Sequence, residues 1–242
     1  NSQYGDETTY NLGGAYHITP NLRAGASYAK GFRAPTFNDL FPGFGGDPDL
    51  KPETSDNYEA FIEYDTLLQS TRLTGYRNNV DDLLANDGVP TTDNPFGSIK
   101  NINKAKIDGI TLTSDWTIDN YLFGGSYDYQ KAKDDSGNSS DGNYLPVRPK
   151  HKGLIYAGYR LENVDVRAEY EYIDDYYYNI SNADSQFVDG YGLLNISGNY
   201  QLNSNLSLTA RLNNITNKTY VIAPSYNTDG TNFFTSLTYN WY

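Results

Sequence analysis

Long stretches of strict alternation between apolar and polar residues constrain the fold of this chain more than any other feature of its sequence. Between Val164 and Tyr172 every second residue is Val, Ala or Tyr, whereas the residues between them are Asp, Arg and Glu. The same period of two runs through 206–213 and 233–241. Such alternation is typical of β-strands with one apolar and one polar face. Helical periodicity is almost absent, so we predict an all-β chain of antiparallel strands.

Eleven segments fit this pattern, and most of them contain 11 or more residues. They are 8–18, 22–32, 55–65, 70–84, 100–116, 120–133, 150–161, 164–172, 187–202, 206–213 and 231–242. Strands in soluble proteins average about five or six residues. Roughly ten residues are enough for a tilted strand to cross a bilayer. The lengths of the segments therefore favour strands that span a membrane.

The connections between these segments alternate between two classes. The short ones are Thr19–Asn21, Thr66–Gln69, Thr117–Asp119, Glu162–Asn163 and Asn203–Asn205. The long ones are rich in Gly, Asp, Asn, Ser and Pro, and they are 33–54, 85–99, 134–149, 174–187 and 215–230. Short turns at one end of the strands and long loops at the other are typical of an outer-membrane β-barrel.

Composition excludes several other classes of protein. The 242 residues contain no Cys and no Met, which excludes disulfide frameworks, Cys-ligated zinc and thiol catalysis. A formal net charge of -12 disfavours nucleic acid as a partner, because phosphates require a basic face. No run of about eighteen apolar residues is present, so a membrane-spanning helix is excluded.

Two folds remain compatible with strands that have one apolar face. In a soluble sandwich the apolar face forms the core, whereas in a wide barrel it contacts lipid and the polar face lines a wet interior. Periodicity alone does not separate these two folds. Strand length, the two classes of connection and tyrosines near strand ends favour the barrel, because amphipathic rings settle at membrane interfaces.

The most specific stretch of the sequence is Phe32–Ser55, which reads FRAPTFNDLFPGFGGDPDLKPETS. It contains an aromatic-Arg-Ala-Pro box, a loop and an Asp-Pro-Asp-Leu-Lys-Pro-Glu box that precedes a predicted strand. In this order the two boxes resemble the signature of TonB-dependent outer-membrane receptors, and 213–220 resembles the penultimate hairpin of that family. The motif residues are Phe32, Arg33, Ala34, Pro35, Asp47, Pro48, Leu50, Pro52 and Glu53.

We expect this motif to be mainly structural. Its prolines restrict the backbone of a long loop and lower the entropy that ordering it would cost. Arg33 and Glu53 lie at predicted strand ends, where their charges can tie the loop to the barrel wall.

The number of strands predicts that the barrel extends beyond this chain. The aromatic terminus Trp241–Tyr242 is like that of outer-membrane barrels, which places the C-terminus in the periplasm and the long loops outside. The first and eleventh strands then run in the same direction and cannot close an antiparallel barrel. The resemblance implies a barrel of about 22 strands. We therefore expect residues 1–242, which begin without Met, to be the C-terminal half, with the plug and about eleven strands supplied elsewhere.

The resemblance also implies a function. Such receptors capture a large, scarce nutrient at the outer membrane and import it with energy from the TonB complex, which acts through the TonB box of the plug. The compact tip Phe41–Gly45 is similar to the vitamin B12 receptor subgroup, so cobalamin is the leading substrate. The expected ligand contacts are Phe41, Phe44, Phe96, Tyr144, Arg148, Tyr176 and Tyr226.

Three alternatives to cobalamin transport remain at this stage. A ferric-siderophore receptor of the same family is the first. A haem receptor is the second, but haem receptors usually carry a histidine between the two boxes, and 36–46 contains none. A passive porin or adhesion barrel is the third alternative.

We expect no bound metal and no catalytic role for the remaining polar groups. The oxygen-rich loop 134–143 could hold Ca²⁺, but it lacks the EF-hand spacing, and we expect a solvated loop and no cofactor. His17 and His151 are expected to be structural or solvated. No catalytic set or metal-ligand spacing is present, so we expect no enzymatic activity, although barrels with an outer-membrane protease or lipase site exist.

A second kind of partner is the membrane itself. Tyr144, Arg148 and Lys150 precede a predicted strand at its loop end and could meet an anionic group or lipopolysaccharide.

Overall fold

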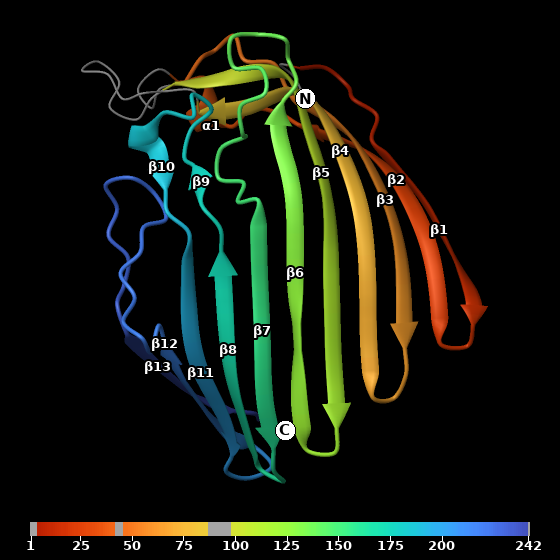
Figure 1. Cartoon of the computed structure of the whole chain (residues 1–242), viewed down its shortest axis with the longest axis vertical. Helices are drawn as coiled ribbons and strands as arrows, with labels where there is room; N and C mark the ends of the chain where they lie inside the picture. Colours follow the sequence, from red (N-terminus) through yellow and green to blue (C-terminus); the bar gives the residue numbers. More distant parts are fainter. Residues whose placement is uncertain (1–3, 42–45, 87–97, 242) are drawn as a thin grey trace.

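One antiparallel sheet of eleven strands makes up most of the computed structural model, which describes residues 4–41, 46–86 and 98–241 (Figure 1). Its strands are β1 Tyr10–Thr19, β2 Leu22–Arg33, β3 Glu53–Asp65, β4 Gln69–Asn86, β5 Ile99–Ile118, β6 Tyr121–Asp134, β7 His151–Arg160, β8 Val164–Ile173, β11 Tyr191–Gln201, β12 Leu206–Asn213 and β13 Asn232–Tyr239. Each strand pairs with its neighbour in sequence order, β11 following β8. The predicted all-β fold of about eleven long antiparallel strands is confirmed.

The sheet is open in the described part of the chain. β1 pairs with β2 alone and β13 with β12 alone. Because every pairing is antiparallel, the first and eleventh strands run in the same direction. Each edge strand therefore has a row of backbone groups with no partner in the described chain. The expectation that further strands continue the barrel remains a prediction.

Some boundaries differ from those expected. The segment 187–202 is two strands: β10 Phe187–Val188 pairs with β9 Tyr176–Tyr177 above the sheet, and only β11 joins the sheet. Gly190 lies between them, where a Cβ would come within 3.0 Å of the Ile173 carbonyl oxygen. The backbone passes close to the end of β8 at this glycine, where the predicted strand is interrupted.

Three further segments were expected as loop or turn. β5 continues to Ile118, so the predicted turn Thr117–Asp119 is shifted toward Asp119–Asn120, and Asp119 adopts a φ of 50°. The loop 33–54 contains a one-turn helix, α1 Phe37–Leu40, and 174–187 contains the short 3₁₀ helix η2 Asp184–Gln186. Among the described residues, no helix is long and apolar enough to cross a membrane.

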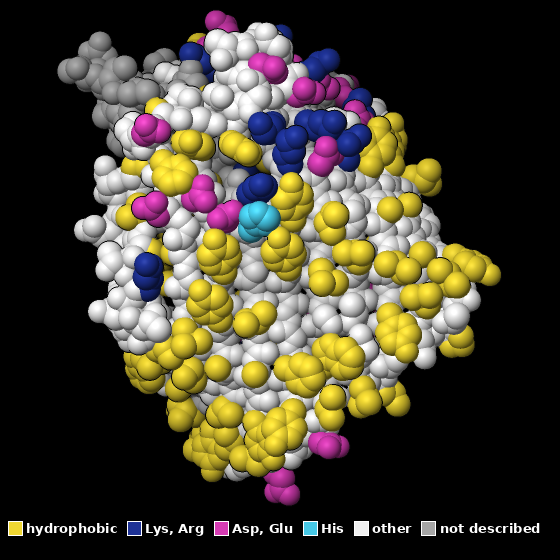
Figure 2. Space-filling model, in the orientation of Figure 1, with side chains coloured by type: hydrophobic (Ala, Val, Ile, Leu, Met, Phe, Trp, Pro, Cys, Tyr) yellow, Lys and Arg dark blue, Asp and Glu magenta, His cyan; other side chains and the backbone are white. Residues whose placement is uncertain are grey.

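The register places apolar residues of neighbouring strands together on one face. Leu73 lies opposite Leu112, Leu194 opposite Tyr170, and Leu208 opposite Leu237. Figure 2 shows hydrophobic side chains spread over the outward, convex face of the strands nearest the viewer, below a band of charged residues. The Leu208 and Leu212 side chains are each 37% exposed and form no closed core.

The opposite, concave face carries ion pairs. Glu63 forms ion pairs with Arg23 at 2.5 Å and with Arg72 at 2.9 Å. Glu169 pairs with Arg211 and, at 3.4 Å, with Arg167. The arrangement is the predicted one, with polar side chains inward and apolar side chains outward.

The buried apolar core lies at the loop end of the sheet and not between layers. It joins the ends of β4, β5 and β6 to the loops that fold over them. Its members are Val80, Ala85, Ile102, Ala105, Ala132, Leu145 and Ile180, with Leu83 and Ile107 packed against it. Leu145 and Ile180 belong to two different loops, so this cluster holds the loops together.

Replacement of Leu145 by Ala is expected to loosen these loops. The side chain is 1% exposed, and removing a buried leucine costs about 2–4 kcal/mol of stability. Hydrogen–deuterium exchange should show faster exchange over 134–149 in Leu145→Ala. The exposed Leu161, at a short turn, is the matched control, and Leu161→Ala should leave exchange of that loop unchanged. Equal protection in both variants would contradict the role of this core.

Candidate functional site at the loop end of the sheet

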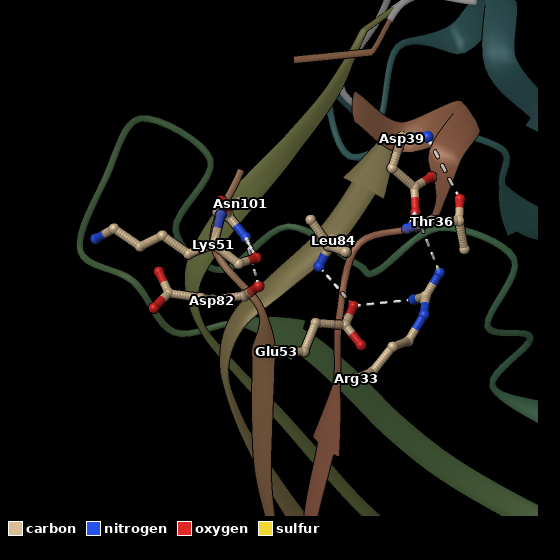
Figure 3. Close-up of polar contacts among 8 residues, drawn as sticks. All are labelled: Arg33, Thr36, Asp39, Lys51, Glu53, Asp82, Leu84 and Asn101. Atoms are coloured by element: carbon tan, nitrogen blue, oxygen red, sulfur yellow. Dashed lines mark hydrogen bonds and ion pairs between the residues drawn. The ribbon is translucent and has the colours of Figure 1, made fainter. Parts of the chain in front are cut away.

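The motif segment between β2 and β3 is closed at its base by an ion pair. Arg33 and Glu53 are register partners, and Arg33 Nη1 lies 3.1 Å from Glu53 Oε1 (Figure 3). The same carboxylate oxygen accepts a hydrogen bond from the Leu84 backbone N–H at 2.6 Å. Glu53 is buried. One buried carboxylate therefore joins the ends of β2, β3 and β4.

The first half of the motif segment is ordered by α1. Thr36 is its N-cap: the Asp39 N–H donates to Thr36 Oγ1 at 3.4 Å, and the Thr36 N–H donates to Asp39 Oδ2 at 2.7 Å. This reciprocal capping box satisfies two backbone donors at the helix start. Arg33 Nη2 lies 3.9 Å from Asp39, which links the helix to β2. The rings of Phe37 and Phe41 stack at 4.0 Å between centroids, and both are exposed.

The second half of the segment is tied to β5 by Asn101. Its Oδ1 accepts from the Lys51 N–H at 2.8 Å, and its Nδ2 donates to the Lys51 carbonyl at 2.9 Å (Figure 3). Nδ2 also donates to the carbonyl of Asp82 at 2.7 Å, where Asp82 adopts a φ of 54°. Leu50 is buried beside these contacts.

The remaining motif residues are also in structural positions. Asp47 accepts a hydrogen bond from the Asp49 N–H at 2.8 Å. The rest differ in exposure: Pro35 is buried, Phe32, Ala34 and Pro52 are half-buried, and Pro48 is exposed. The motif thus orders the loop and presents the Phe37–Phe41 pair at its surface.

The residues predicted to contact ligand have different environments. Phe41, Tyr144, Arg148 and Tyr226 are exposed, and Phe44 and Phe96 lie outside the described residues. Among those described, no hydrogen bond, ion pair or ring contact joins one of these side chains to another. The loop end therefore carries them as separate exposed groups.

Tyr176 was predicted to contact ligand, but it is buried. Its side chain is 7% exposed, and its hydroxyl donates to the Ile222 carbonyl at 2.8 Å. Burial also raises the pKa of this phenol above its ordinary value. Tyr176 therefore joins the loop 174–187 to the loop 214–231 and has little surface left for a ligand.

Tyr144 is held in place by a neighbouring loop. Its N–H donates to Asn182 Oδ1 at 2.7 Å, and Asn182 Nδ2 donates to the Tyr144 carbonyl at 2.9 Å. The Lys133 ammonium lies 4.7 Å from the centre of the Tyr144 ring, which is a cation–π contact. Sequence reasoning missed Asn182 and Lys133, although their partner was predicted.

Sequence reasoning also missed Phe37, which forms one surface with Phe41. Both lie between the two motif boxes, at positions i and i+4, so one helical turn brings them together. The signal was present in the sequence, but 33–54 was predicted only as a long loop.

The oxygen-rich loop 134–143 uses its polar groups internally. Asp134 Oδ1 accepts from the Ser136 N–H at 2.8 Å, and Asp134 Oδ2 accepts from the Ser140 hydroxyl at 2.6 Å. Asp141 accepts from the Gly137 N–H at 3.0 Å. Within the described ranges, no group of three or more His, Asp and Glu side chains is placed to hold a metal ion.

The concave face below the loops is hollowed and polar. A cavity of about 460 Å³ is lined by residues of β3 to β6, which are Glu59, Arg72, Thr74, Tyr76, Thr111, Thr113 and Asp128. Asp128 accepts hydrogen bonds from the Thr111 hydroxyl at 2.5 Å and the Tyr76 hydroxyl at 3.3 Å. The Asp128 carboxylate is thus hydrogen-bonded by side chains of the wall itself.

Comparison with known proteins identifies the family. The family described as "TonB dependent receptor-like, beta-barrel" matches residues 1–215. The chain belongs to the TonB-dependent receptors. The family is one of outer-membrane β-barrels, and the resemblance read from the two motif boxes is confirmed.

Two relatives carry the same name. The vitamin B12 transporter BtuB of Photobacterium profundum is 34% identical over 247 residues, covering 100% of this chain and 39% of the relative. The vitamin B12 transporter BtuB of Vibrio vulnificus is 30% identical, covering 99% of this chain and 38% of the relative. The chain therefore spans about two fifths of the length of these curated relatives.

Solved structures of TonB-dependent receptors share the fold. A mutant of the ferric enterobactin receptor PfeA from Pseudomonas aeruginosa superposes with a TM-score of 0.76 at 21% identity, covering 98% of this chain and 40% of that one. The copper transporter OprC gives a TM-score of 0.78 at 18% identity, covering 95% and 39%. The named relatives are transporters and receptors.

Removal of the buried carboxylate at the base of the motif segment is expected to destabilise it. In Glu53→Gln the ion pair with Arg33 is lost, and we expect a loss of about 1–2 kcal/mol, because the partner is partly exposed. Asp165→Asn is the matched control: Arg160 and Asp165 are also register partners, but both are exposed (58% and 44%, against 54% and 12% for Arg33 and Glu53). The loss of stability in Asp165→Asn should stay below about 0.5 kcal/mol. Thermal unfolding of the two variants measures the difference, and equal losses would contradict a special role for Glu53.

Proposed function

We propose that this chain forms part of the barrel wall of an outer-membrane transporter that imports cobalamin. The observation that carries the substrate is the likeness to two vitamin B12 transporters across the whole chain, at 34% and 30% identity. The exposed Phe37–Phe41 pair supports it, because a flat apolar surface at the loop end suits a large ring-bearing ligand.

In this proposal the wall binds and steers the ligand. The motif network fixes the height and direction of the aromatic pair, since Arg33 joins β2 to both Glu53 and Asp39. Tyr144, Arg148 and Tyr226 supply further exposed groups on neighbouring loops. The wall has no catalytic part in transport.

Transport itself requires parts beyond the described sheet. The edge strands β1 and β13 run in the same direction, and in lipid each unpaired backbone group would cost several kcal/mol. We propose that further strands of the receptor close the barrel, with a plug inside the polar concave face. Energy then comes from the TonB complex through that plug.

A binding titration of the complete receptor tests the substrate. Cyanocobalamin should bind more tightly than a ferric siderophore or haem, and tighter binding of either competitor would overturn the assignment.

The aromatic pair gives a sharper test of the same site. Phe41→Ala and Phe37→Ala should each weaken cyanocobalamin binding about 5- to 30-fold, because each removes stacking and apolar contact worth about 1–2 kcal/mol. Tyr121, exposed at a short turn at the other end of the sheet, is the control. Tyr121→Ala should bind as the unmodified receptor does. If all three variants bind equally, the pair is no part of the ligand site.

A further inference from the structure

Asn101 of β5 holds the second half of the motif segment, as Arg33 holds the first (Figure 3). Its side-chain amide makes two hydrogen bonds to one residue, accepting from the Lys51 N–H at 2.8 Å and donating to the Lys51 carbonyl at 2.9 Å. Two residues of paired antiparallel strands exchange hydrogen bonds in the same way. The amide therefore fixes the backbone of Lys51 in both position and orientation.

The same amide is anchored in the sheet at Asp82. Asn101 Nδ2 donates to the Asp82 carbonyl at 2.7 Å. Asp82 lies within β4 but adopts a φ of 54°, which residues other than glycine rarely do. Local strain of this kind persists where the surrounding structure holds it, and it clusters at functional positions. Asn101 and Asp82 thus form a fixed point at the loop end of β4 and β5.

From Lys51, contacts between backbone atoms lead to the exposed aromatic pair. The Asp47 N–H donates to the Asp39 carbonyl of α1 at 2.8 Å, and the Gly46 N–H donates to the Phe41 carbonyl at 3.1 Å. A Cβ on Gly46 would lie 2.5 Å from the Asp39 carbonyl oxygen, so the two halves of the segment are in close contact. Residues 46–51 therefore lie directly against the residue that carries one of the two rings.

The turn between these contacts is compact. The Leu50 N–H donates to the Asp47 carbonyl at 3.3 Å, and the Asp49 N–H donates to the Asp47 carboxylate at 2.8 Å. The Leu50 side chain is buried. A turn closed by two hydrogen bonds and a buried side chain transmits a displacement of Lys51 to α1 instead of absorbing it.

Arg33 reaches α1 by a weaker contact. Its Nη2 atom lies 3.9 Å from Asp39, and its side chain is 54% exposed. Ion pairs at exposed positions contribute little, whereas each short hydrogen bond of a half-buried amide contributes more. Of the two connections to the wall, the one through Asn101 therefore holds the segment more firmly.

We propose that Asn101 is the positioning residue of the proposed ligand site. It sets where the Phe37–Phe41 pair stands above the barrel wall, and it acts through Lys51 and residues 46–51. The inference rests on the proposed function, because the ligand that meets the pair is the cobalamin proposed above. Asn101 itself does not touch the ligand, and its contribution is to order the rings before binding.

Cyanocobalamin titration of the complete receptor measures this contribution. Asn101→Ala removes all three hydrogen bonds and should weaken binding about five- to tenfold, because binding must then order the pair. Asn103, exposed two residues further along β5, is the matched control, and Asn103→Ala should bind as the unmodified receptor does. Unchanged binding in Asn101→Ala, or an equal loss in Asn103→Ala, would overturn the proposal.

A double-mutant cycle separates positioning from general damage to the fold. If Asn101 acts through the rings, Asn101→Ala should weaken binding less than about twofold once Phe37 and Phe41 are both replaced by Ala, because no pair is left to position. General damage would weaken binding by the same factor in both backgrounds. Equal factors would therefore contradict the positioning role.

Gly46→Ala interrupts the same path at its other end. The added methyl would meet the backbone of Asp39 and Phe41, and binding should weaken about fivefold or more. Gly75 is the matched control, because a Cβ there would meet no atom within 4 Å, and Gly75→Ala should bind normally. Normal binding in Gly46→Ala would overturn the proposed path.

Hydrogen–deuterium exchange without ligand separates this inference from the proposed function. In Asn101→Ala the amides of Gly46 and Asp47 should exchange about tenfold faster, whereas the amide of Leu84, which has a different partner, should not change. A receptor with this pattern that binds no cobalamin would contradict only the proposed substrate. Unchanged exchange at Gly46 and Asp47 would overturn the positioning role whatever the ligand.

Discussion

Continuous hydrogen bonding between neighbouring antiparallel strands is the constraint on which the rest of the structure depends. The side-chain period of a strand is two, so a slip of one residue would exchange its two faces. The observed register keeps Leu73 beside Leu112 and Leu208 beside Leu237 on the same outward surface. Arginines and glutamates such as Arg72 and Glu63 then meet on the other surface. Both surfaces of the wall follow from this single pairing.

A wall that is one sheet thick has no core between layers. The apolar packing that orders its loops therefore lies at the loop end of the sheet. The cluster around Leu145 and Ile180 provides apolar burial there. Glu53, Asn101 and Asn182 provide hydrogen bonds between segments far apart in sequence. The exposed aromatic rings of the proposed ligand site are carried on this ordered base.

Much of this architecture could be predicted because strand alternation is a local property. The number of strands, the two classes of connection and the structural role of Arg33 and Glu53 were all readable from residue order. The split of 187–202 was not, because it depends on a close backbone approach of Gly190 to the end of β8. The burial of Tyr176, which was expected to contact ligand, could not be predicted either. The exposure of a tyrosine depends on which loop covers it, and here that loop contains Ile222.

By itself the sequence determined which residues share a strand face, which segments form the strands of the wall and which family the motif boxes indicate. These features depend on spacing within ten to twenty-five residues, and neighbouring residues are enough to set them. Only the tertiary structure decided which faces meet. The opposition of Leu73 and Leu112 is set by the β4–β5 register, and the contact of Asn101 with Lys51 by the way the motif segment lies over the end of β5. Contacts between distant segments require the whole sheet, because strand pairing alone brings those residues together.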